Sequence, residues 1–502
     1  MMKNKIYKYS EPRLKFAYGQ ELTDPRDGLT IFGPFDKGRI NDFSVGLIGT
    51  SIGIRRCKDY LNKINKPVFH TKKDIAYPFF PGFEEVFDVK FNLSHSPEIQ
   101  IDESSITLLA RYTDNYIRVG ELVDLYVDHI VSFNKENEKR PNLWFVVIPD
   151  IIYQVSRPRS TVGGKDSIKV GLTDRYSGLL FADEQTVRWQ RSYNYENHFH
   201  NQLKIKLLNH SILTQIIKES TIAYHEMYSE YKVNSMKVSD TAKAWNISTA
   251  LYYKLGGMPW KLSSVRKGVC YIGLTFKKDE TKLDPKYACC AAQMFLDSGD
   301  GMVFRGRVGP YYNPDTEEYH LTRKSAYDVL NMVIKAYKRS NNGSLPKQLF
   351  IHGKTFFEDD EWEGFVEAAK QENESIEIIG IRIRSDNTLK LFRSSGDFPI
   401  LRGSAFINRH NEAYLWTKGF IPRIQSILGL ETPNGLNVRI IRGEADINDV
   451  CRDILALTKL NYNSCIFCDG QPVTLKFADT IGEILTAGPN ENLDVLPFMY
   501  YI

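Results

Sequence analysis

The sequence predicts an α/β protein made of two successive units, the first with a parallel sheet and the second with a mixed sheet. Up to residue 257, apolar strands alternate with helical patterns, which favours a parallel sheet. Gly256-Gly257 and Pro259 then interrupt the chain. After this break the expected order is three strands, a helix, a strand, a helix and a strand, which is the order of an RNase H-like fold.

The first unit is expected to begin with a strand followed by a helix. Phe43 to Gly49 is an apolar run that ends in glycine, and Ile54 to Ile64 has apolar residues at helical spacing. Leu143 to Ile148 predicts a second buried strand, which Pro149-Asp150 ends. Between 154 and 200 the pattern is weak and predicts no element.

A helix that begins near Ser239-Asp240 is expected to close this unit. Ser239 is a favourable N-cap residue, and Gly256-Gly257 followed by Pro259 is typical of a helix end. The apolar stripe of this helix is Ala244, Ile247, Leu251 and Leu255. We therefore predict an N-terminal arm over 1–40, a first domain over 41–257 and a second domain over 258–502.

The second unit is expected to begin with a strand over Tyr271–Phe276. Ala291 to Arg305 predicts two strands joined by the turn-forming residues 297–301, and Tyr319 to Leu321 is expected to close a third-strand region. The remaining expected elements are a helix over 323–339, a strand over 348–352, a helix over 360–372 and a strand over 376–383.

Composition limits the classes of protein that this chain can be. The 502 residues carry a formal net charge of +4 and seven cysteines, which are scattered and odd in number. Such cysteines fit reduced thiols in a cytoplasm better than a disulfide framework. No apolar run reaches the roughly 18 residues of a membrane span, and the N-terminus has no signal-peptide pattern. A single CxxC, Cys465 and Cys468, gives little support for a zinc site.

Several common enzyme motifs are absent. His352-Gly353-Lys354-Thr355 resembles the end of a phosphate-binding P-loop, but position 348, where the motif needs a glycine, is Gln. No GxGxxG follows a strand, and neither GxSxG nor HExxH occurs. These absences give no support for a nucleotide-binding P-loop, a Rossmann dinucleotide site or a common hydrolase.

Four polar residues between 200 and 254 form a candidate anion site. His200 and Lys204 are four residues apart, which puts them on one face of a helix, and Gln215 lies inside an apolar run. Lys254 precedes Leu255-Gly256-Gly257. Each residue also has an ordinary alternative: a helix-terminal histidine, a solvated lysine, an edge-strand amide, and a lysine that favours a helix C-terminus.

Taken together, these residues resemble the guide 5′-phosphate pocket of an Argonaute MID domain. Glu11 to Phe16, followed by Gly28-Leu29 and Gly33-Pro34, also resembles the opening of prokaryotic Argonautes. The resemblance covers essentially the whole chain and leaves no room for N and PAZ domains, so it is to the short class. It implies a Rossmann-like MID domain followed by an RNase H-like PIWI domain.

The resemblance also implies roles for the four residues. His200, Lys204, Gln215 and Lys254 are expected to bind the 5′ phosphate of the guide, although His200 stands where many relatives have Tyr. A Mg²⁺ ion is expected to join that phosphate to Gln215 and to the carboxylate of Ile502, because Mg²⁺ prefers oxygen ligands. The apolar tail that ends at Ile502 is expected to be buried.

The PIWI cleavage site is expected to be inactive. PIWI nucleases hold two metal ions with a set of carboxylates. This sequence has Thr275 at the first position and Lys354 near the second, and only Asp479 matches the last. Glu317 or Glu318 is the candidate for the remaining glutamate.

The resemblance therefore implies recognition of a target without cleavage. It implies a guide RNA, a single-stranded DNA target, and a heterodimer with a TIR-APAZ or other APAZ effector protein that forms higher oligomers on activation in prokaryotic defence. The expected location is the cytoplasm, without membrane association. The alternative is a guided nuclease with an unconventional carboxylate set, such as Asp297, Asp300 and Asp479, although Asp297 and Asp300 have the composition of a turn.

Overall fold

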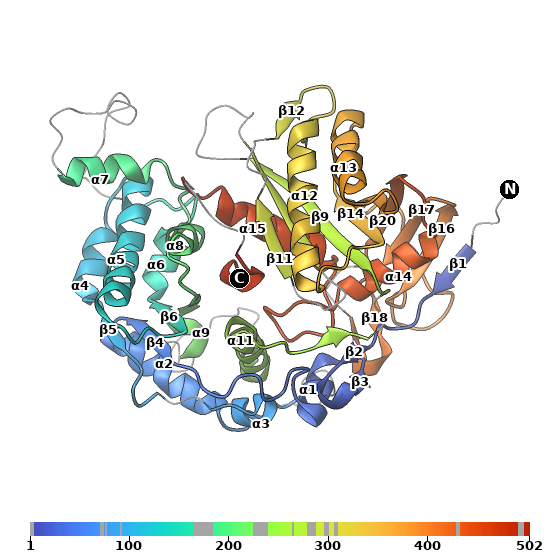
Figure 1. The fold of residues 1–502 in the computed structure, drawn as a ribbon. Coiled ribbons are helices and arrows are strands. Elements are labelled where there is room, and N and C mark those ends of the chain that lie inside the picture. The colour runs from blue at the N-terminus through green and yellow to red at the C-terminus, as the bar shows by residue number, and fades with distance from the viewer. Residues whose placement is uncertain are drawn as a thin grey trace.

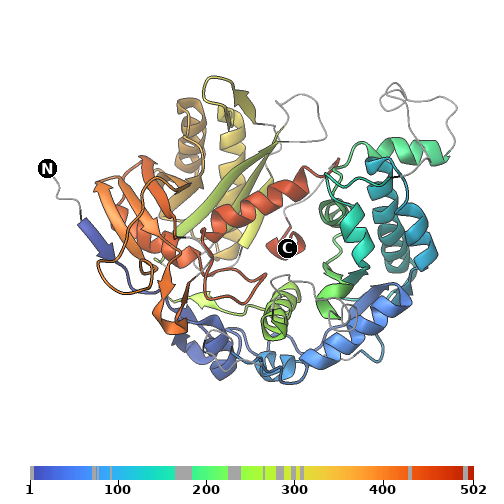
Figure 2. The ribbon, with the colours of Figure 1, turned by 180° about the vertical axis from the view of Figure 1, so that it is seen from behind.

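Two α/β units lie side by side in the computed structural model of the protein (Figure 1), the first on the left of the view and the second on the right. Figure 2 shows from behind that helix α15 (Val473–Leu485) crosses the middle of the molecule. Within the described residues, no helix is long and apolar enough to cross a membrane. The structure describes residues 5–70, 75, 78–90, 93–163, 184–223, 239–263, 266–278, 288–295, 301–305, 310–427, 432–489 and 496–502.

The first unit is built on a four-stranded parallel sheet with the order β5-β4-β6-β7. Every residue of β4 and β6 is buried, which explains their continuous apolar sequences, since helices cover parallel strands on both faces. The register places Trp144 beside Thr214. The strands are β4 (Val45–Gly49), β5 (Glu98–Gln100), β6 (Leu143–Ile148) and β7 (Thr214–Lys218).

The helices of this unit differ in how well the sequence predicts them. Helix α2 (Ser51–Ile64) begins three residues earlier than expected, because Oγ1 of Thr50 accepts a hydrogen bond from Gly53 N at 2.9 Å. The long α5 (Asn115–Glu136), which Asp114 caps, was not predicted. The others are α3 (Phe83–Phe87), α4 (Glu103–Leu109), α6 (Asp150–Val155), α7 (Glu184–Ser192), α8 (Phe199–Leu208), α9 (Glu219–Ile222) and α11 (Asp240–Lys254).

The second unit is built on a nine-stranded mixed sheet with the order β1-β16-β17-β20-β15-β14-β9-β10-β11. Strands β9, β14 and β15 run parallel, whereas β9, β10 and β11 are antiparallel, which confirms the predicted strand order. The strands are β9 (Val269–Lys278), β10 (Ala288–Phe295), β11 (Gly301–Arg305), β14 (Gln348–Gly353), β15 (Glu377–Asp386), β16 (Ser404–Arg409), β17 (Glu412–Trp416) and β20 (Gly435–Arg442).

One expected strand lies elsewhere. Residues 319–321 do not close the third-strand region of the main sheet, because β13 (Glu318–His320) pairs only with β12 (Tyr311–Asn313) in a separate hairpin. The third strand is β11. The smaller strands β18 (Phe420–Ile421) and β19 (Ser426–Ile427) form another two-stranded sheet beside the short helix η2 (Pro422–Ile424).

Helices cover both faces of the nine-stranded sheet. Helices α12 (Arg323–Ser340) and α13 (Asp359–Glu372) pack with Ile272 and Leu274 of β9, while α14 (Ile447–Leu457) and α15 share the other core with Tyr271. At Gly273 a Cβ atom would lie 1.9 Å from the carbonyl oxygen of Thr474. Glycine therefore lets α15 approach β9 closely.

The N-terminal segment joins the second unit. Strand β1 (Lys5–Lys8) forms the edge of the nine-stranded sheet against β16, and Glu11 accepts hydrogen bonds from Arg402 Nε at 3.0 Å and Lys459 Nζ at 2.8 Å. The domain boundaries at 40 and 257 remain predictions. The other elements of this segment and its small sheet are β2 (Leu14–Lys15), η1 (Ala17–Gly19), β3 (Glu21–Leu22), α1 (Pro25–Phe32) and β8 (Lys261–Leu262).

Candidate nucleic-acid interface

Three of the four residues predicted for the anion site meet through hydrogen bonds. Lys204 Nζ donates to the carbonyl oxygen of Thr214 at 3.0 Å, and Lys254 Nζ donates to the same oxygen at 3.1 Å. Lys254 Nζ also donates to Oε1 of Gln215 at 2.7 Å. Both lysine side chains are buried. The side chains of Lys204 on α8 and Lys254 on α11 therefore meet at the carbonyl oxygen of Thr214, at the beginning of β7. We refer to Lys204, Gln215, Lys254 and Ile502 as the lysine pocket.

The end of the chain reaches the same point. Lys204 Nζ donates to the main-chain oxygen of Ile502 at 2.7 Å, and Ile502 is buried as expected. Helix η3 (Phe498–Tyr500) holds this segment in place, because the ring of Phe498 packs against Phe477 of α15 and Tyr253 of α11. Residues from α8, β7, α11 and the last turn of the chain thus form one pocket.

The charge of this pocket is not balanced by acidic side chains. Among the described residues, no Asp or Glu forms an ion pair with Lys204 or Lys254. Burial lowers the pKa of Lys204 to about 7, and burial together with the charge of Lys204 holds the pKa of Lys254 well below its usual value. A bound anion would favour the protonated form of both amines and raise these pKa values.

His200 lies one helical turn before Lys204 on α8. Its ring is within 3.0 Å of Oδ1 of Asn201, and burial, aided by the charge of Lys204, lowers the pKa of His200 to about 4. The ring is therefore neutral at pH 7. Among the described residues, no hydrogen bond joins His200 to either lysine, so His200 lies at the border of the lysine pocket, where the charges of both lysines help to lower its pKa.

The carbonyl group of Thr214 is the part of this site that sequence analysis missed. It accepts from both lysines and fixes their separation. A main-chain carbonyl carries no information in residue type, so no motif could have identified it. Only the neighbouring Gln215 marked the place where β7 begins.

The oxygen atoms of the lysine pocket suit a Mg²⁺ ion in chemical type. The side-chain oxygen of Gln215 and the main-chain oxygen of Ile502 are both held near the lysines. Mg²⁺ prefers oxygen ligands and commonly keeps phosphate oxygens among them. The described residues contain no group of three His, Cys, Asp or Glu side chains that could bind a metal ion. A metal here would therefore need oxygen atoms from the ligand.

The three positions of the expected cleavage site lie near one end of the nine-stranded sheet. Gly353, the last residue of β14, pairs with Leu274, so Lys354 follows the end of β14 next to the part of β9 that contains Thr275. Lys354 forms an ion pair with Asp479 of α15. Thr275 is buried, and its hydroxyl has no hydrogen-bond partner among the described residues.

The candidates for additional carboxylates have different positions. Glu318 pairs with Arg384 and accepts from Phe356 N at 3.3 Å, close to the Lys354 loop. Glu317 occupies a turn with a φ of 55° and is exposed. Asp297 and Asp300 lie outside the described residues. Among the described acidic residues here, both Asp479 and Glu318 are thus paired with a cation.

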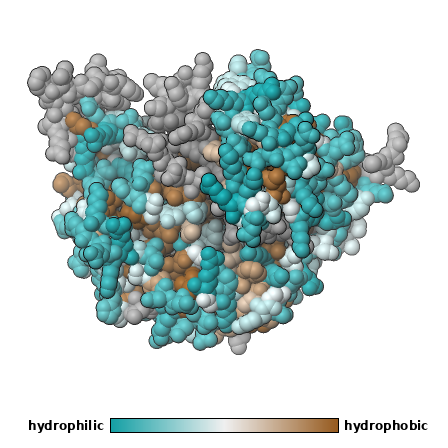
Figure 3. Space-filling view, viewed as in Figure 1, coloured by the Kyte–Doolittle hydropathy of each residue, from teal (hydrophilic) through white to brown (hydrophobic). Residues whose placement is uncertain are grey.

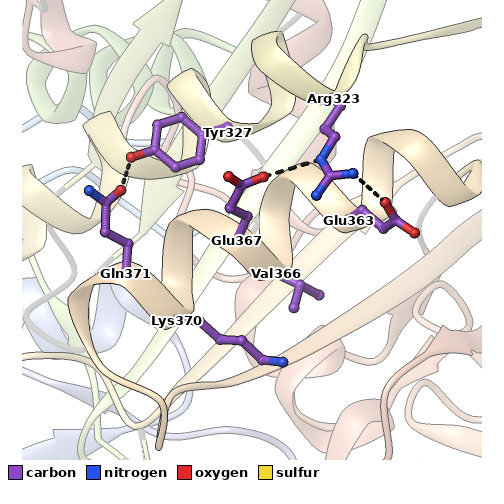
Figure 4. A pocket seen from close by; sticks show the side chains of 7 residues that line it. All are labelled: Arg323, Tyr327, Glu363, Val366, Glu367, Lys370 and Gln371. Atoms are coloured by element: carbon purple, nitrogen blue, oxygen red, sulfur yellow. Dashed lines mark hydrogen bonds and ion pairs between the residues drawn. The ribbon is translucent and has the colours of Figure 1, made fainter.

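A separate groove lies on the outer face of the second unit. It has a volume of about 720 Å³ and runs between α12 and α13 (Figure 4). Its charged residues pair with one another, since Arg323 contacts Glu363 at 2.7 Å and Glu367 at 3.1 Å. Figure 3 shows that this part of the surface is largely hydrophilic, whereas hydrophobic residues gather nearer the middle of the view. None of the residues that line the groove belongs to the two clusters above.

Comparison with known proteins gives one sequence match over a small part of the chain and several structural matches over almost the whole chain. No protein-family model matches the chain. Prolyl 4-hydroxylase 2 of Arabidopsis thaliana is 28% identical over 144 residues, which is 26% of this chain and 48% of that protein. This alignment leaves most of both proteins unmatched and does not establish a family.

Solved structures match almost the whole chain. Clostridium butyricum Argonaute, bound to a guide DNA and a 19-mer target DNA, superposes with a TM-score of 0.64 at 16% identity, over 98% of this chain and 55% of that chain. This chain has an Argonaute-like fold. A. aeolicus Argonaute matches with a TM-score of 0.57 at 15% identity, again over 98% and 55% of the two chains. Drosophila Piwi matches with 0.58 at 13% identity, over 99% and 56%.

The Argonaute-like fold confirms the predicted fold class, a Rossmann-like MID unit followed by an RNase H-like PIWI unit. The chain spans about 55% of the length of the Argonaute structures that it matches. The first unit is called the MID-like unit below and the second the PIWI-like unit.

Proposed function

We propose that the protein binds a guide strand by its 5′ phosphate and uses it to recognise a complementary target strand without cutting it. The observation that carries this proposal is the convergence of Lys204 and Lys254 on the Thr214 carbonyl, beside Gln215 and Ile502. A terminal phosphate has nearly two negative charges and three acceptor oxygens, so it matches two ammonium groups and an amide. The Argonaute-like fold supports the same role.

A divalent cation would complete this site. We propose that Gln215 and the carboxylate of Ile502 would hold a Mg²⁺ ion next to the guide phosphate, while the lysines would neutralise the remaining charge. His200, at the border of the lysine pocket, would contact the first nucleotide. The lysines, Gln215 and Ile502 hold and orient the phosphate, and the ion supplies two further positive charges.

The residues near the end of β14 support the proposed absence of cleavage. Two-metal cleavage needs several carboxylates that share two ions. Thr275 has no carboxylate, Lys354 places an ammonium group beside Asp479, and Glu318 is paired with Arg384. A lysine that is already ion-paired with the remaining aspartate opposes metal binding there. The rival proposal, a nuclease with an unconventional carboxylate set, would have to work against this charge arrangement.

If the protein binds its target without cutting it, a second protein must convert that binding into an effect. We propose that the chain acts with an effector protein that contains an APAZ region, with a TIR domain that consumes NAD as the favoured effector, in prokaryotic defence against plasmids or phage. An RNA guide and a single-stranded DNA target are the proposed ligands. Support for this partner comes from the resemblance to short prokaryotic Argonautes.

Guide binding provides the direct test. Purified protein is titrated with one RNA that carries either a 5′ phosphate or a 5′ hydroxyl group, with and without Mg²⁺, and then with complementary and unrelated single-stranded DNA. We expect tight binding that requires the phosphate, followed by binding of the complementary DNA, which remains uncut. Equal affinity for both RNAs would refute the proposed pocket, and cut target would favour the nuclease.

A further inference from the structure

We propose that Glu196 and Asn201 fix the ring of His200 so that its Nε2 accepts a hydrogen bond from a donor group of the guide's first nucleoside. That donor is the ribose hydroxyl group or an N–H group of the base. This inference rests on the proposed function, because the guide must first be held by its 5′ phosphate. It assigns a positioning role to Glu196 and Asn201, and it names the kind of group that is recognised beside the phosphate.

Three side chains form a series of hydrogen bonds at the start of α8. Nδ2 of Asn201 donates to Oε2 of Glu196 at 3.2 Å. On the other side of the same amide group, Oδ1 of Asn201 lies 3.0 Å from Nδ1 of His200. Asn201 is buried, and a buried polar group whose partners are all in place is held rigidly. The amide group of Asn201 therefore connects the carboxylate to the imidazole ring in one fixed arrangement.

The carboxylate of Glu196 determines which way the amide group of Asn201 faces. An ionised carboxylate only accepts hydrogen bonds, so the NH₂ group is turned toward Glu196 and the amide oxygen toward His200. The amide oxygen also only accepts, so Nδ1 of His200 carries the hydrogen atom of this bond. In a neutral imidazole ring only one nitrogen is protonated, and Nε2 of His200 therefore has a lone pair to accept with.

The second ring nitrogen of His200 is open to a ligand. The ring is neutral at pH 7, since burial and the charge of Lys204 lower its pKa to about 4. Among the described residues, Nδ1 is used by Asn201 and Nε2 has no hydrogen-bond partner. The residue is half-buried, and Nε2 is not one of the fully buried atoms that lack a partner, so a ligand can reach it. Nε2 is thus a free acceptor at the border of the lysine pocket.

Main-chain hydrogen bonds hold Glu196 in place. Its N donates to the carbonyl oxygen of Ala487, in the segment that follows α15, at 2.7 Å. Its carbonyl oxygen accepts from His198 N at 2.8 Å and from Nε2 of Gln202, a buried residue of α8, at 3.2 Å. Glu196 is therefore fixed both to its own unit and to the second unit, and the carboxylate starts from an anchored main chain.

A terminal phosphate does not match the acceptor Nε2 of His200. At neutral pH it has nearly two negative charges, and its oxygens act as acceptors. The lone pair of a neutral ring nitrogen repels such a group, whereas the amines of Lys204 and Lys254 offer it donors. The ribose hydroxyl and the base N–H groups of the first nucleotide are donors that do match. The lysines therefore hold the phosphate, and His200 recognises the nucleoside attached to it.

The test combines modified guides with the spectrum of the histidine ring. Full-length protein is titrated with 5′-phosphorylated guide RNAs that begin with adenosine, 2′-deoxyadenosine or purine riboside. The second lacks the ribose hydroxyl, and the third lacks the amino group of the base. Dissociation constants are measured for the wild type, His200→Phe, Asn201→Ala and Asn209→Ala. Asn209 is the exposed C-cap residue of α8 and controls for the loss of an amide from the same helix.

Nitrogen-15 spectra of protein with labelled histidine report the protonation of each ring nitrogen. They are recorded with and without the adenosine guide. The chain has ten histidines, so the signals that disappear in His200→Phe identify the ring of His200.

We expect one of the two modified guides to bind the wild type about threefold to tenfold more weakly, as for a lost hydrogen bond between neutral groups. The guide that does so identifies the donor. His200→Phe should bind all three guides equally and still require the 5′ phosphate. Asn201→Ala should lose most of the discrimination, and Asn209→Ala should keep it. The wild-type spectrum should show protonated Nδ1 and unprotonated Nε2, and Asn201→Ala should show both tautomers.

Each alternative outcome has a distinct meaning. If the wild type binds all three guides equally but still requires the 5′ phosphate, the role of His200 is refuted and the proposed function stands. A protonated Nε2 in the guide-bound protein has the same meaning. If the 5′ phosphate makes no difference to binding, both proposals fail. Discrimination and a single tautomer that persist in Asn201→Ala would overturn the positioning role. The series of guides on the wild type decides the proposal even if Asn201→Ala does not fold.

Discussion

The lysines of the two clusters differ in their burial and in their ion pairing. In the lysine pocket, Lys204 and Lys254 are buried, and no acidic side chain among the described residues pairs with them. At the end of β14, Lys354 is half-exposed and is paired with Asp479. Burial disfavours the charged form of the first two lysines, and a bound anion would favour it, whereas the exposed pair is stable without a ligand. The comparison predicts that substitutions in the first cluster affect function much more than those in the second.

The largest expected difference is in activation of the effector partner. Lys204→Ala should reduce NAD consumption by the complex to background, because a protein that cannot hold the guide cannot form the guide–target duplex. Asp479→Ala should leave NAD consumption largely intact, because a single carboxylate performs no two-metal chemistry. NAD consumption is measured with guide and complementary target present. The expected difference between the two clusters is contradicted if Asp479→Ala abolishes NAD consumption while binding of the duplex is unchanged.

Guide affinity should show the next largest effect. Lys204→Ala, Gln215→Ala and Lys254→Ala should each weaken binding of the 5′-phosphorylated guide by a factor of ten or more, since a charge-assisted hydrogen bond contributes about 1.5–3 kcal/mol. Binding of the 5′-hydroxyl guide should change much less. The matched control is Lys206→Ala on the same helix, because Lys206 is paired with Asp124 at 2.5 Å. Equal losses for both guides would reduce these residues to general backbone contacts.

A smaller effect is expected from extension of the chain beyond Ile502. Added residues should move the carboxylate away from the phosphate and place polar groups in a buried position. We expect a loss of guide affinity of about fivefold, which corresponds to about 1 kcal/mol. Two versions of the protein that carry the same tag, one at each end of the chain, are compared by fluorescence anisotropy. Equal guide affinity of the two tagged proteins would remove the carboxylate from the site.

The last expected effect is on stability, not on ligand binding, and comes from the core of the PIWI-like unit. Burial lowers the pKa of His352 from 6.5 to about 3. Between these two pH values His352 binds a proton in the unfolded chain but not in the folded chain. Its contribution to stability is therefore present above pH 6.5 and is lost as the pH falls toward 3. The slope is about 1.4 kcal/mol per pH unit.

His352→Gln should therefore make urea unfolding less sensitive to pH between 6.5 and 4.5. Glutamine can keep a hydrogen bond to Oγ1 of Thr474, which lies 3.0 Å from Nδ1 of His352. The measured quantity is the difference in the free energy of unfolding between variant and wild type. A difference that stays constant with pH would show that His352 is not the titrating group.

The sequence predicted those features that depend on local patterns. The buried strands β4, β6, β9 and β14 are continuous apolar runs, and Ser239 caps α11 as expected. The lysine pocket could be assembled in advance only because the resemblance grouped its residues. Spacing alone left His200, Lys204, Gln215 and Lys254 with ordinary alternatives.

Features that depend on distant contacts escaped prediction. The Thr214 carbonyl has no side-chain pattern, and the convergence of Arg382 and Arg384 on the Lys354 carbonyl depends on how β15 lies beside β14. The hairpin of β12 and β13 was assigned to the wrong sheet, because a short strand has the same alternation wherever it pairs. The ion pair between Lys354 and Asp479 joins residues that only the fold brings together.

The pairing of β1 with β16 has a consequence for biosynthesis. Lys5–Lys8 leaves the ribosome early, but its partner Ser404–Arg409 is made about 400 residues later. At about 5–20 residues per second, the first strand waits for roughly 20–80 s before the other half of its ladder exists. During that interval it is an unpaired edge, and its two lysines oppose pairing with other chains. Strand β1 is therefore synthesised well before β16 but can take its place in the sheet only after β16 has been made.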